Sequence, residues 1–92
     1  MEFKDKVAVV TGGGNGIGRA VCLGFAARGA RVVVVDREAD AAAAVAAEIG
    51  GNAIACTADV TRSADVQAYV ARALETFGRI DCFHNNAGIE GR

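Results

Sequence analysis

A glycine-dense turn between an apolar run and a helical pattern constrains this chain more than any other feature. Residues 12–18 contain five glycines; they follow the apolar run of residues 7–10 and lead into the amphipathic segment of residues 17–27. Turn glycines adopt positive φ and let a ligand approach the backbone with no Cβ in the way. The helix start adds unpaired N–H groups and about half a positive charge. We therefore predict a phosphate site here, best suited to the pyrophosphate of a dinucleotide.

The spacing of the glycines narrows the kind of phosphate site. Gly12, Gly16 and Gly18 do not fall in the G-x-G-x-x-G register of the common dinucleotide fingerprint. A nucleotide-triphosphatase loop would carry Lys and then Ser or Thr after its last glycine, and Arg19 and Ala20 stand there instead. A tight strand-to-helix connection without a ligand is the other interpretation, and the density of glycine directly after a strand argues against it.

Strand and helix patterns alternate along the whole chain. Strands are predicted over residues 6–10, 31–35, 52–57 and 79–84, and helices over residues 17–27, 38–49 and 63–77. This alternation predicts parallel strands joined by right-handed crossovers, and near-continuous apolar strands are typical of a sheet covered on both faces. The predicted fold class is α/β, the N-terminal half (βαβαβαβ) of a Rossmann-type doubly wound parallel sheet with strand order 3-2-1-4. Residues 1–92 are predicted to form one dinucleotide-binding domain that is truncated after its fourth strand.

The third predicted helix offers two local expectations. Ser63 is expected to cap its N-terminus, since a serine hydroxyl can accept a hydrogen bond from a first-turn N–H group. The residues expected on its buried face are Val66, Val70, Ala73, Leu74 and Phe77.

The composition excludes several classes of function. The chain has 10 basic and 11 acidic residues with no basic stripe, so neither nucleic acid nor an anionic membrane is expected as a partner. No apolar stretch is long enough to span a bilayer, and the first residues do not resemble a signal peptide. We therefore expect a cytoplasmic protein. Cys22, Cys56 and Cys82 lie far apart in apolar segments; we expect them to pack in the core, and we predict no metal site.

An acidic residue follows the second predicted strand. Asp36 comes eighteen residues after Gly18, and a carboxylate at this place accepts both ribose hydroxyls of an adenosine and repels a 2′-phosphate. The sequence therefore favours NAD over NADP as the cofactor. Arg37 argues the other way, because a neighbouring guanidinium can bind that phosphate. Asp36 can also serve as a turn or N-cap residue for the next helix, a role compatible with ribose binding.

A second acidic residue follows the third predicted strand. Asp59 can accept a hydrogen bond from an adenine amino group while Val60 offers the ring an apolar edge. A role for Asp59 in a local turn before the next helix explains it equally well. Because the carboxyl ends of parallel strands meet at one edge of the sheet, Asp36, Asp59 and the glycine turn are expected to converge there.

The fourth predicted strand leads into two amides and two small residues. Asn85 and Asn86 can tie neighbouring strand ends together through their side chains. Ala87 and Gly88 leave the backbone bare, so that a ribose can lie against it. His84 is expected to pack within the sheet, because no Ser or Asp partner that would suit a catalytic role is identifiable nearby.

Three motifs together resemble the short-chain dehydrogenase/reductase family. Its T-G-x-x-x-G-x-G motif matches residues 11–18, its D-V pair matches Asp59-Val60, and its N-N-A-G motif matches residues 85–88. The resemblance spans nearly the whole chain, and the joint occurrence of these motifs at these intervals is highly specific. It implies a Rossmann fold and a nicotinamide cofactor.

The resemblance also implies where the cofactor binds. The cofactor-binding residues implied at the turn are Gly12, Gly14, Asn15, Gly16, Ile17 and Gly18. The residues implied at the adenosine are Asp36 and Arg37 at its ribose and Asp59 and Val60 at its adenine. Those implied near the cofactor's ribose are Asn86, Ala87 and Gly88.

The catalytic Ser and Y-x-x-x-K pair of that family have no match here. The single tyrosine, Tyr69, is followed at the fourth position by Ala73 and precedes the last predicted strand, so it is not the catalytic tyrosine. We name no catalytic residue. The chain is expected to be the cofactor-binding part of the protein, truncated after its fourth strand and inactive alone.

The sequence thus predicts the NAD-binding part of an oxidoreductase that transfers a hydride between a nicotinamide cofactor and an alcohol or carbonyl substrate. A nucleotide-binding or sensing module without enzymatic activity is the alternative. A methyltransferase-like domain is a third interpretation, against which the N-N-A-G motif argues. The open edge of the fourth strand predicts a homo-oligomer or association with a missing C-terminal segment.

Overall fold

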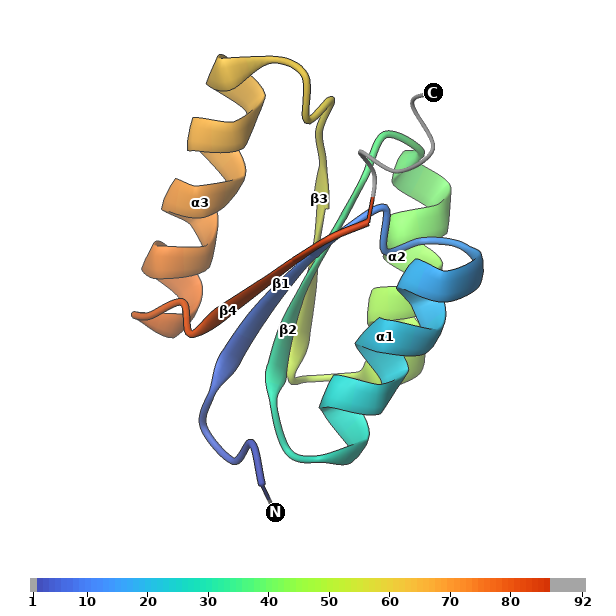
Figure 1. Ribbon diagram of the computed structural model, residues 1–92, viewed down its shortest axis with the longest axis vertical. Helices are drawn as coiled ribbons and strands as arrows, with labels where there is room; N and C mark the ends of the chain where they lie inside the picture. Colours follow the sequence, from blue (N-terminus) through green and yellow to red (C-terminus); the bar gives the residue numbers. More distant parts are fainter. Residues whose placement is uncertain (1, 87–92) are drawn as a thin grey trace.

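The computed structural model describes residues 2–86 and forms a parallel sheet with helices on both faces (Figure 1). The elements are β1 (Val7–Thr11), α1 (Gly16–Ala27), β2 (Arg31–Asp36), α2 (Ala39–Ile49), β3 (Ala53–Thr57), α3 (Ser63–Phe77) and β4 (Cys82–Asn85). The strand order is β3-β2-β1-β4 and every pair is parallel, so the predicted topology is confirmed. In Figure 1, α1 and α2 cover one face of the sheet and α3 covers the other.

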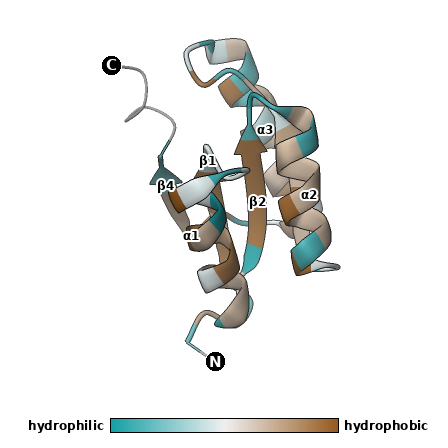
Figure 2. Ribbon diagram, turned by 90° about the vertical axis from the view of Figure 1, so that its right-hand side faces the viewer, coloured by the Kyte–Doolittle hydropathy of each residue, from teal (hydrophilic) through white to brown (hydrophobic). Residues whose placement is uncertain are grey.

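The two faces of the sheet carry separate apolar clusters. On the face covered by α3, Val9 and Val33 pack with Tyr69 and Ala73 of the helix. On the other face, Val10, Val32 and Val34 pack with residues of α1 and α2. Figure 2 shows β2 as an almost continuously hydrophobic strand, as expected for a strand buried on both sides. The two clusters thus bury both faces of the sheet.

The helix α3 differs from its prediction in two details. Ser63 is the first helical residue and Arg62 holds the N-cap position without a side-chain hydrogen bond, so the predicted Ser63 cap is wrong. Leu74 is 46% exposed, whereas Tyr69 is buried. Tyr69 and Ala73 lie four residues apart and define the axis of the buried stripe, which leaves Leu74 on its margin. Ala73 is buried, and Val66, Val70 and Phe77 pack against the same cluster, so the predicted buried face is confirmed except for Leu74.

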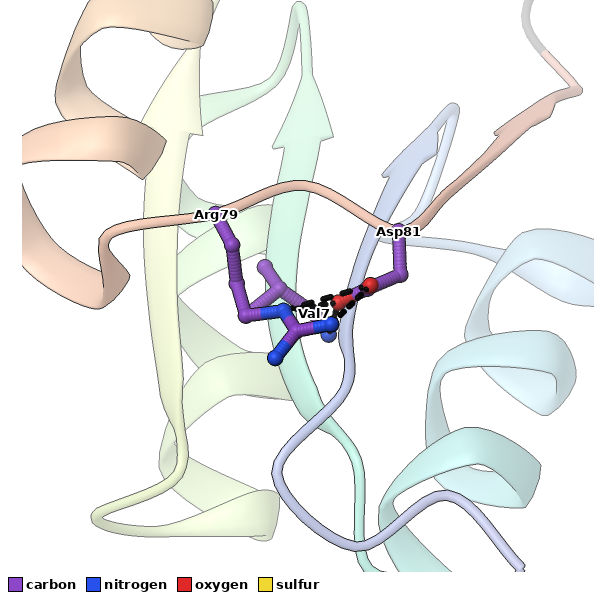
Figure 3. Close-up of polar contacts among 3 residues, drawn as sticks. All are labelled: Val7, Arg79 and Asp81. Atoms are coloured by element: carbon purple, nitrogen blue, oxygen red, sulfur yellow. Dashed lines mark hydrogen bonds and ion pairs between the residues drawn. The ribbon is translucent and has the colours of Figure 1, made fainter.

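The strand β4 begins later than its apolar pattern predicts. The Asp81 N–H donates to Val7 O, but the Val7 N–H donates to the Asp81 carboxylate, at 2.8 Å, and not to a backbone carbonyl. Arg79 completes the arrangement with a bidentate contact to Asp81, including Nη2–Oδ1 at 2.7 Å (Figure 3). The side chain of Asp81 thereby takes the place of a ladder acceptor, and regular pairing starts at Cys82.

The structure shows where the three cysteines lie and whether the described residues could hold a metal ion or span a membrane. Cys22 and Cys56 are buried, and burial raises the pKa of the Cys22 thiol to about 12; Cys82 is half-buried. Within residues 2–86, no cluster of His, Cys, Asp and Glu is suited to hold a metal ion. None of the helices described has both the length and the apolar character needed to cross a bilayer.

Candidate functional site

The carboxyl ends of the four strands form one rim of the sheet, and the predicted site residues follow these ends. The glycine turn follows β1, Asp36 ends β2, Asp59 and Val60 follow β3, and Asn86 follows β4. Since β1 lies between β2 and β4, the turn sits at the centre of this rim. Ala87 and Gly88 lie outside the described residues.

The turn requires glycine at particular positions. Gly12 has φ +66° and Gly16 has φ +53°, values that residues with a Cβ rarely adopt. Gly18 lies against the start of the turn, where an added Cβ would overlap the carbonyl oxygen of Gly12. The first turn of α1 is therefore seated directly on the loop that precedes it. A Cβ on Gly16, in contrast, would meet no atom of residues 2–86 within 4 Å other than those of its chain neighbours and its own helix backbone.

The start of α1 is open to a negatively charged ligand. Asn15 is the N-cap residue and makes no side-chain cap hydrogen bond, and the first turn carries no acidic residue. The first turns of α2 and α3 carry Asp40 and Asp65 respectively. The first N–H groups of a helix have no intrahelical acceptor and lie at its positive end. Among the described helices, α1 is thus the one whose positive end is not offset by an acid of its own first turn.

Ile17 stands beside these amides. Its side chain is 71% exposed, although it is apolar and lies four and eight residues before Val21 and Phe25, which are partly buried against the core. The four-residue spacing of Ile17, Val21 and Phe25 predicts one apolar face of α1, and the structure places Val21 and Phe25 on it but leaves Ile17 exposed. An exposed apolar side chain next to an open helix start is suited to contact the uncharged part of a bound molecule.

Asp36 connects the end of β2 to two other segments. Its Oδ2 accepts the Gly14 N–H at 2.9 Å and its Oδ1 accepts the Glu38 N–H at 2.9 Å. Glu38 is the N-cap residue of α2, so Asp36 acts as the turn residue before that helix and not as its cap. A carboxylate offers about four lone-pair positions, which leaves it capacity for ligand hydroxyls.

Asp59 is engaged in a local turn. Its Oδ1 accepts hydrogen bonds from the Thr61 N–H at 2.9 Å and from the Thr61 hydroxyl at 2.6 Å. These bonds, with a smaller contribution from the positive charges of Arg37 and Arg62, hold the pKa of Asp59 below its usual value. Val60 is half-buried against the core beneath α3. Asp59 thus serves as a turn residue before α3, as one of its two interpretations predicted. Its Oδ1 atom accepts the hydrogen bonds of that turn.

Thr11 joins the ends of β1 and β4. Its hydroxyl lies 2.9 Å from Asn85 Oδ1 and 3.5 Å from the His84 carbonyl oxygen, and it accepts the Asn86 N–H at 3.1 Å. Asn86 is 6% exposed. The sequence predicted that Asn85 and Asn86 connect neighbouring strand ends, but it did not identify Thr11 as the residue to which they bond. The signal that could have found it is the position of Thr11, the one polar residue at the end of an otherwise apolar strand.

Known families and proteins match almost the whole chain. The family model described as short chain dehydrogenase matches residues 6–92. Levodione reductase of Leifsonia aquatica is 45% identical over 99% of this chain and 36% of its own length. The 7alpha-hydroxysteroid dehydrogenase of Escherichia coli (strain K12) is 44% identical over 99% of this chain and 37% of its own length. The chain thus spans about a third of the length of these relatives.

A solved structure shares the arrangement of the elements. The 3-ketoacyl-(acyl-carrier-protein) reductase from Brucella melitensis, complexed with NADH, superposes with a TM-score of 0.86 at 46% identity. The match covers 87% of this chain and 33% of the reductase. Both the fold and the sequence of that reductase are therefore close to those described above.

Proposed function

The chain belongs to the short-chain dehydrogenase family, and we propose that it forms the cofactor-binding part of an oxidoreductase that transfers a hydride between a nicotinamide dinucleotide and an alcohol or carbonyl group. One observation carries the proposal: the open start of α1, lined by glycines, lies beside the Asp36 carboxylate at the carboxyl edge of the sheet. Helix starts of this kind bind pyrophosphate in dinucleotide-binding folds. When bound, the nicotinamide supplies or accepts the hydride.

The turn suits the pyrophosphate of the cofactor. The residues proposed to surround it are Gly12, Gly14, Asn15, Gly16, Ile17 and Gly18. Gly16 supports this placement, because in the described part of the chain only its own neighbours and helix backbone lie close to the space that a Cβ would take there. The N–H groups of the first turn of α1 would donate to the phosphate oxygens, and the exposed Ile17 side chain would pack beside them.

The other residues at the carboxyl edge of the sheet suit the adenosine and the second ribose of the cofactor. Asp36 and Arg37 are proposed at the adenine ribose, with Asp59 and Val60 at the adenine. The free capacity of the Asp36 carboxylate supports the first assignment, and the exposure of Arg37 is compatible with it. Those proposed near the cofactor's ribose are Asn86, Ala87 and Gly88.

The choice between the two nicotinamide dinucleotides depends on charge. We propose NAD as the cofactor, because the Asp36 carboxylate would lie where NADP carries its 2′-phosphate.

Replacing Asp36 with Ala should narrow or reverse the preference of the full-length protein for NADH over NADPH. Fluorescence titration with both reduced cofactors measures this preference, and equal affinities of the unaltered protein for both would overturn the assignment to NAD.

A bulky side chain at Gly16 tests the pyrophosphate site. Gly16→Val places a branched Cβ in the space proposed for the phosphate and also strains the backbone at positive φ. We expect NADH affinity to fall at least about tenfold, equal to about 1.4 kcal/mol. Gly24→Val is the matched control, because Gly24 lies on an exposed stretch of the same helix with open space around it. Unchanged NADH affinity in folded Gly16→Val protein would show that the turn is not the site.

A further inference from the structure

The carboxylate of Asp36 accepts a hydrogen bond from the backbone of the glycine turn. Its Oδ2 accepts the Gly14 N–H, and its Oδ1 accepts the Glu38 N–H, both at 2.9 Å. One side chain at the end of β2 therefore holds the backbone of the turn after β1 and the backbone before α2. Hydrogen bonds to an ionised acceptor are about twice as strong as neutral ones.

The neighbourhood of Gly14 shows how closely the turn is fitted to this place. A Cβ on Gly14 would lie 2.6 Å from the Cβ of Ala41 and 3.0 Å from Asp36 Oδ2. The preceding residue is bonded to the same strand, since the Gly13 N–H donates to the Val35 carbonyl at 3.0 Å. The turn thus rests on the end of β2 through one backbone bond and one bond to the Asp36 side chain.

We propose that Asp36 is a positioning residue for the pyrophosphate site, in addition to its proposed contact with the ribose. By holding the Gly14 N–H, the carboxylate fixes the orientation of the backbone that leads through Asn15 into the first turn of α1. The amides of that turn are then aimed at the phosphate before the cofactor arrives, which lowers the cost of ordering the loop on binding. This inference rests on the proposed function.

Asp36 would influence cofactor binding in two ways, through its negative charge and through its hydrogen bond to the turn. A comparison of NADH with NADPH affinity alone does not distinguish these two effects. Loss of the negative charge favours any anion at this edge, including a 2′-phosphate. Loss of the hydrogen-bond acceptor loosens the turn and disfavours every ligand that carries a pyrophosphate. A substitution that removes both properties therefore weakens NADH binding without a matching gain for NADPH.

Inorganic pyrophosphate distinguishes the two effects, because it can occupy the turn but has no ribose. Asp36→Ala and Asp36→Asn both lack the charge, and Asn keeps one amide oxygen, which can accept the Gly14 N–H when the side chain gives up the bond to the Glu38 N–H. We expect the full-length Asp36→Asn protein to bind pyrophosphate about tenfold more tightly than Asp36→Ala, from the strength of one hydrogen bond. Asp36→Leu, which has the shape of Asn without an acceptor, should behave like Asp36→Ala and replaces it if that variant does not fold.

Two further measurements complete the test. The Gly14 amide proton, followed by NMR without ligand, should exchange with solvent faster in Asp36→Ala than in Asp36→Asn. Asp40→Ala and Asp40→Asn are the matched control pair, because Asp40 is an exposed acid in the nearby first turn of α2; these two should bind pyrophosphate equally.

The outcomes separate this inference from the proposed function. Equal pyrophosphate affinities and equal Gly14 exchange in Asp36→Ala and Asp36→Asn, with NADH still bound by the unaltered protein, would overturn the positioning role alone. Failure of the unaltered protein to bind either NADH or pyrophosphate would overturn the proposed function together with the inference.

Discussion

Gly18 illustrates how closely backbone segments approach one another at the rim of the sheet. An added Cβ would overlap the carbonyl oxygen of Gly12, which is part of the backbone and cannot turn aside as a side chain can. We expect Gly18→Ala to lower the free energy of unfolding by about 3 kcal/mol or more, as an overpacked site does. Chemical denaturation monitored by circular dichroism measures the change.

Gly24 of the same helix provides the control for this prediction. Its side-chain position is exposed and open, so Gly24→Ala should leave the stability unchanged or raise it by up to about 1 kcal/mol through helix propensity. If Gly18→Ala proved as stable as Gly24→Ala, the close approach of α1 to the turn would be wrong.

The residue types at the rim were predictable from the sequence, but several of their contacts were not. The positive φ of Gly12 and Gly16 follows from glycine in a tight turn. The bond from Gly14 to Asp36 depends on the register in which β1 lies beside β2, and the contact of Thr11 with Asn85 depends on the register of β1 with β4. A linear pattern carries no direct information about either register.

At the scale of elements, periodicity located each helix and strand described within residues 2–86, and local side-chain hydrogen bonds shifted some of their ends. The order and parallel pairing followed from the alternation of elements. The late start of β4 could not be predicted, because it depends on the Asp81 carboxylate accepting a hydrogen bond from the Val7 N–H of the neighbouring strand β1. The misplaced cap at Ser63 has a similar origin: the N–H of Asp59 donates to Asp65 in the first turn of α3, so an acid in the turn orders this helix start.

The ion pair at the start of β4 predicts a pH dependence of stability. Hydrogen bonds from Arg79, followed by that from the Val7 N–H, hold the pKa of Asp81 below its usual value. A carboxyl group with a lowered pKa in the folded state stabilises the fold above its unfolded pKa of about 3.9. That stabilisation is lost as the pH falls through the folded-state pKa.

The variant Asp81→Asn tests this expectation. It should be less stable than the unaltered protein at neutral pH, and the difference should shrink as the pH falls below about 4. Urea denaturation at a series of pH values measures the difference. Arg79→Gln should reduce the pH dependence of stability, because it removes the largest cause of the lowered pKa of Asp81 but keeps the hydrogen bond from the Val7 N–H. A stability difference that stays constant down to pH 2 would contradict the assignment.

At the scale of the whole molecule, β4 is one of the two edge strands of the sheet formed by residues 2–86, and β3 is the other. Phe83 pairs in register with Val9, so both side chains project toward the face that carries α3. Phe83 is nevertheless 55% exposed. A parallel edge with an exposed aromatic side chain is prone to pair with another chain.

We therefore expect the 92-residue chain to self-associate when it is prepared alone. Phe83→Lys should weaken this association several-fold, because a charge on an edge strand opposes pairing. Glu75→Lys, at an exposed position on α3, makes a charge change without removing an apolar contact and is the control. Sedimentation velocity measures the association, and a folded monomer at high concentration would contradict the prediction.

The central claim is that the turn between β1 and α1 binds the pyrophosphate of a nicotinamide dinucleotide. A crystal structure of the full-length protein with NADH tests it most directly. We predict that the phosphate oxygens accept hydrogen bonds from the first-turn amides of α1 and that the adenine ribose lies at Asp36. NADH bound elsewhere in the protein, with no phosphate at this turn, would contradict the claim.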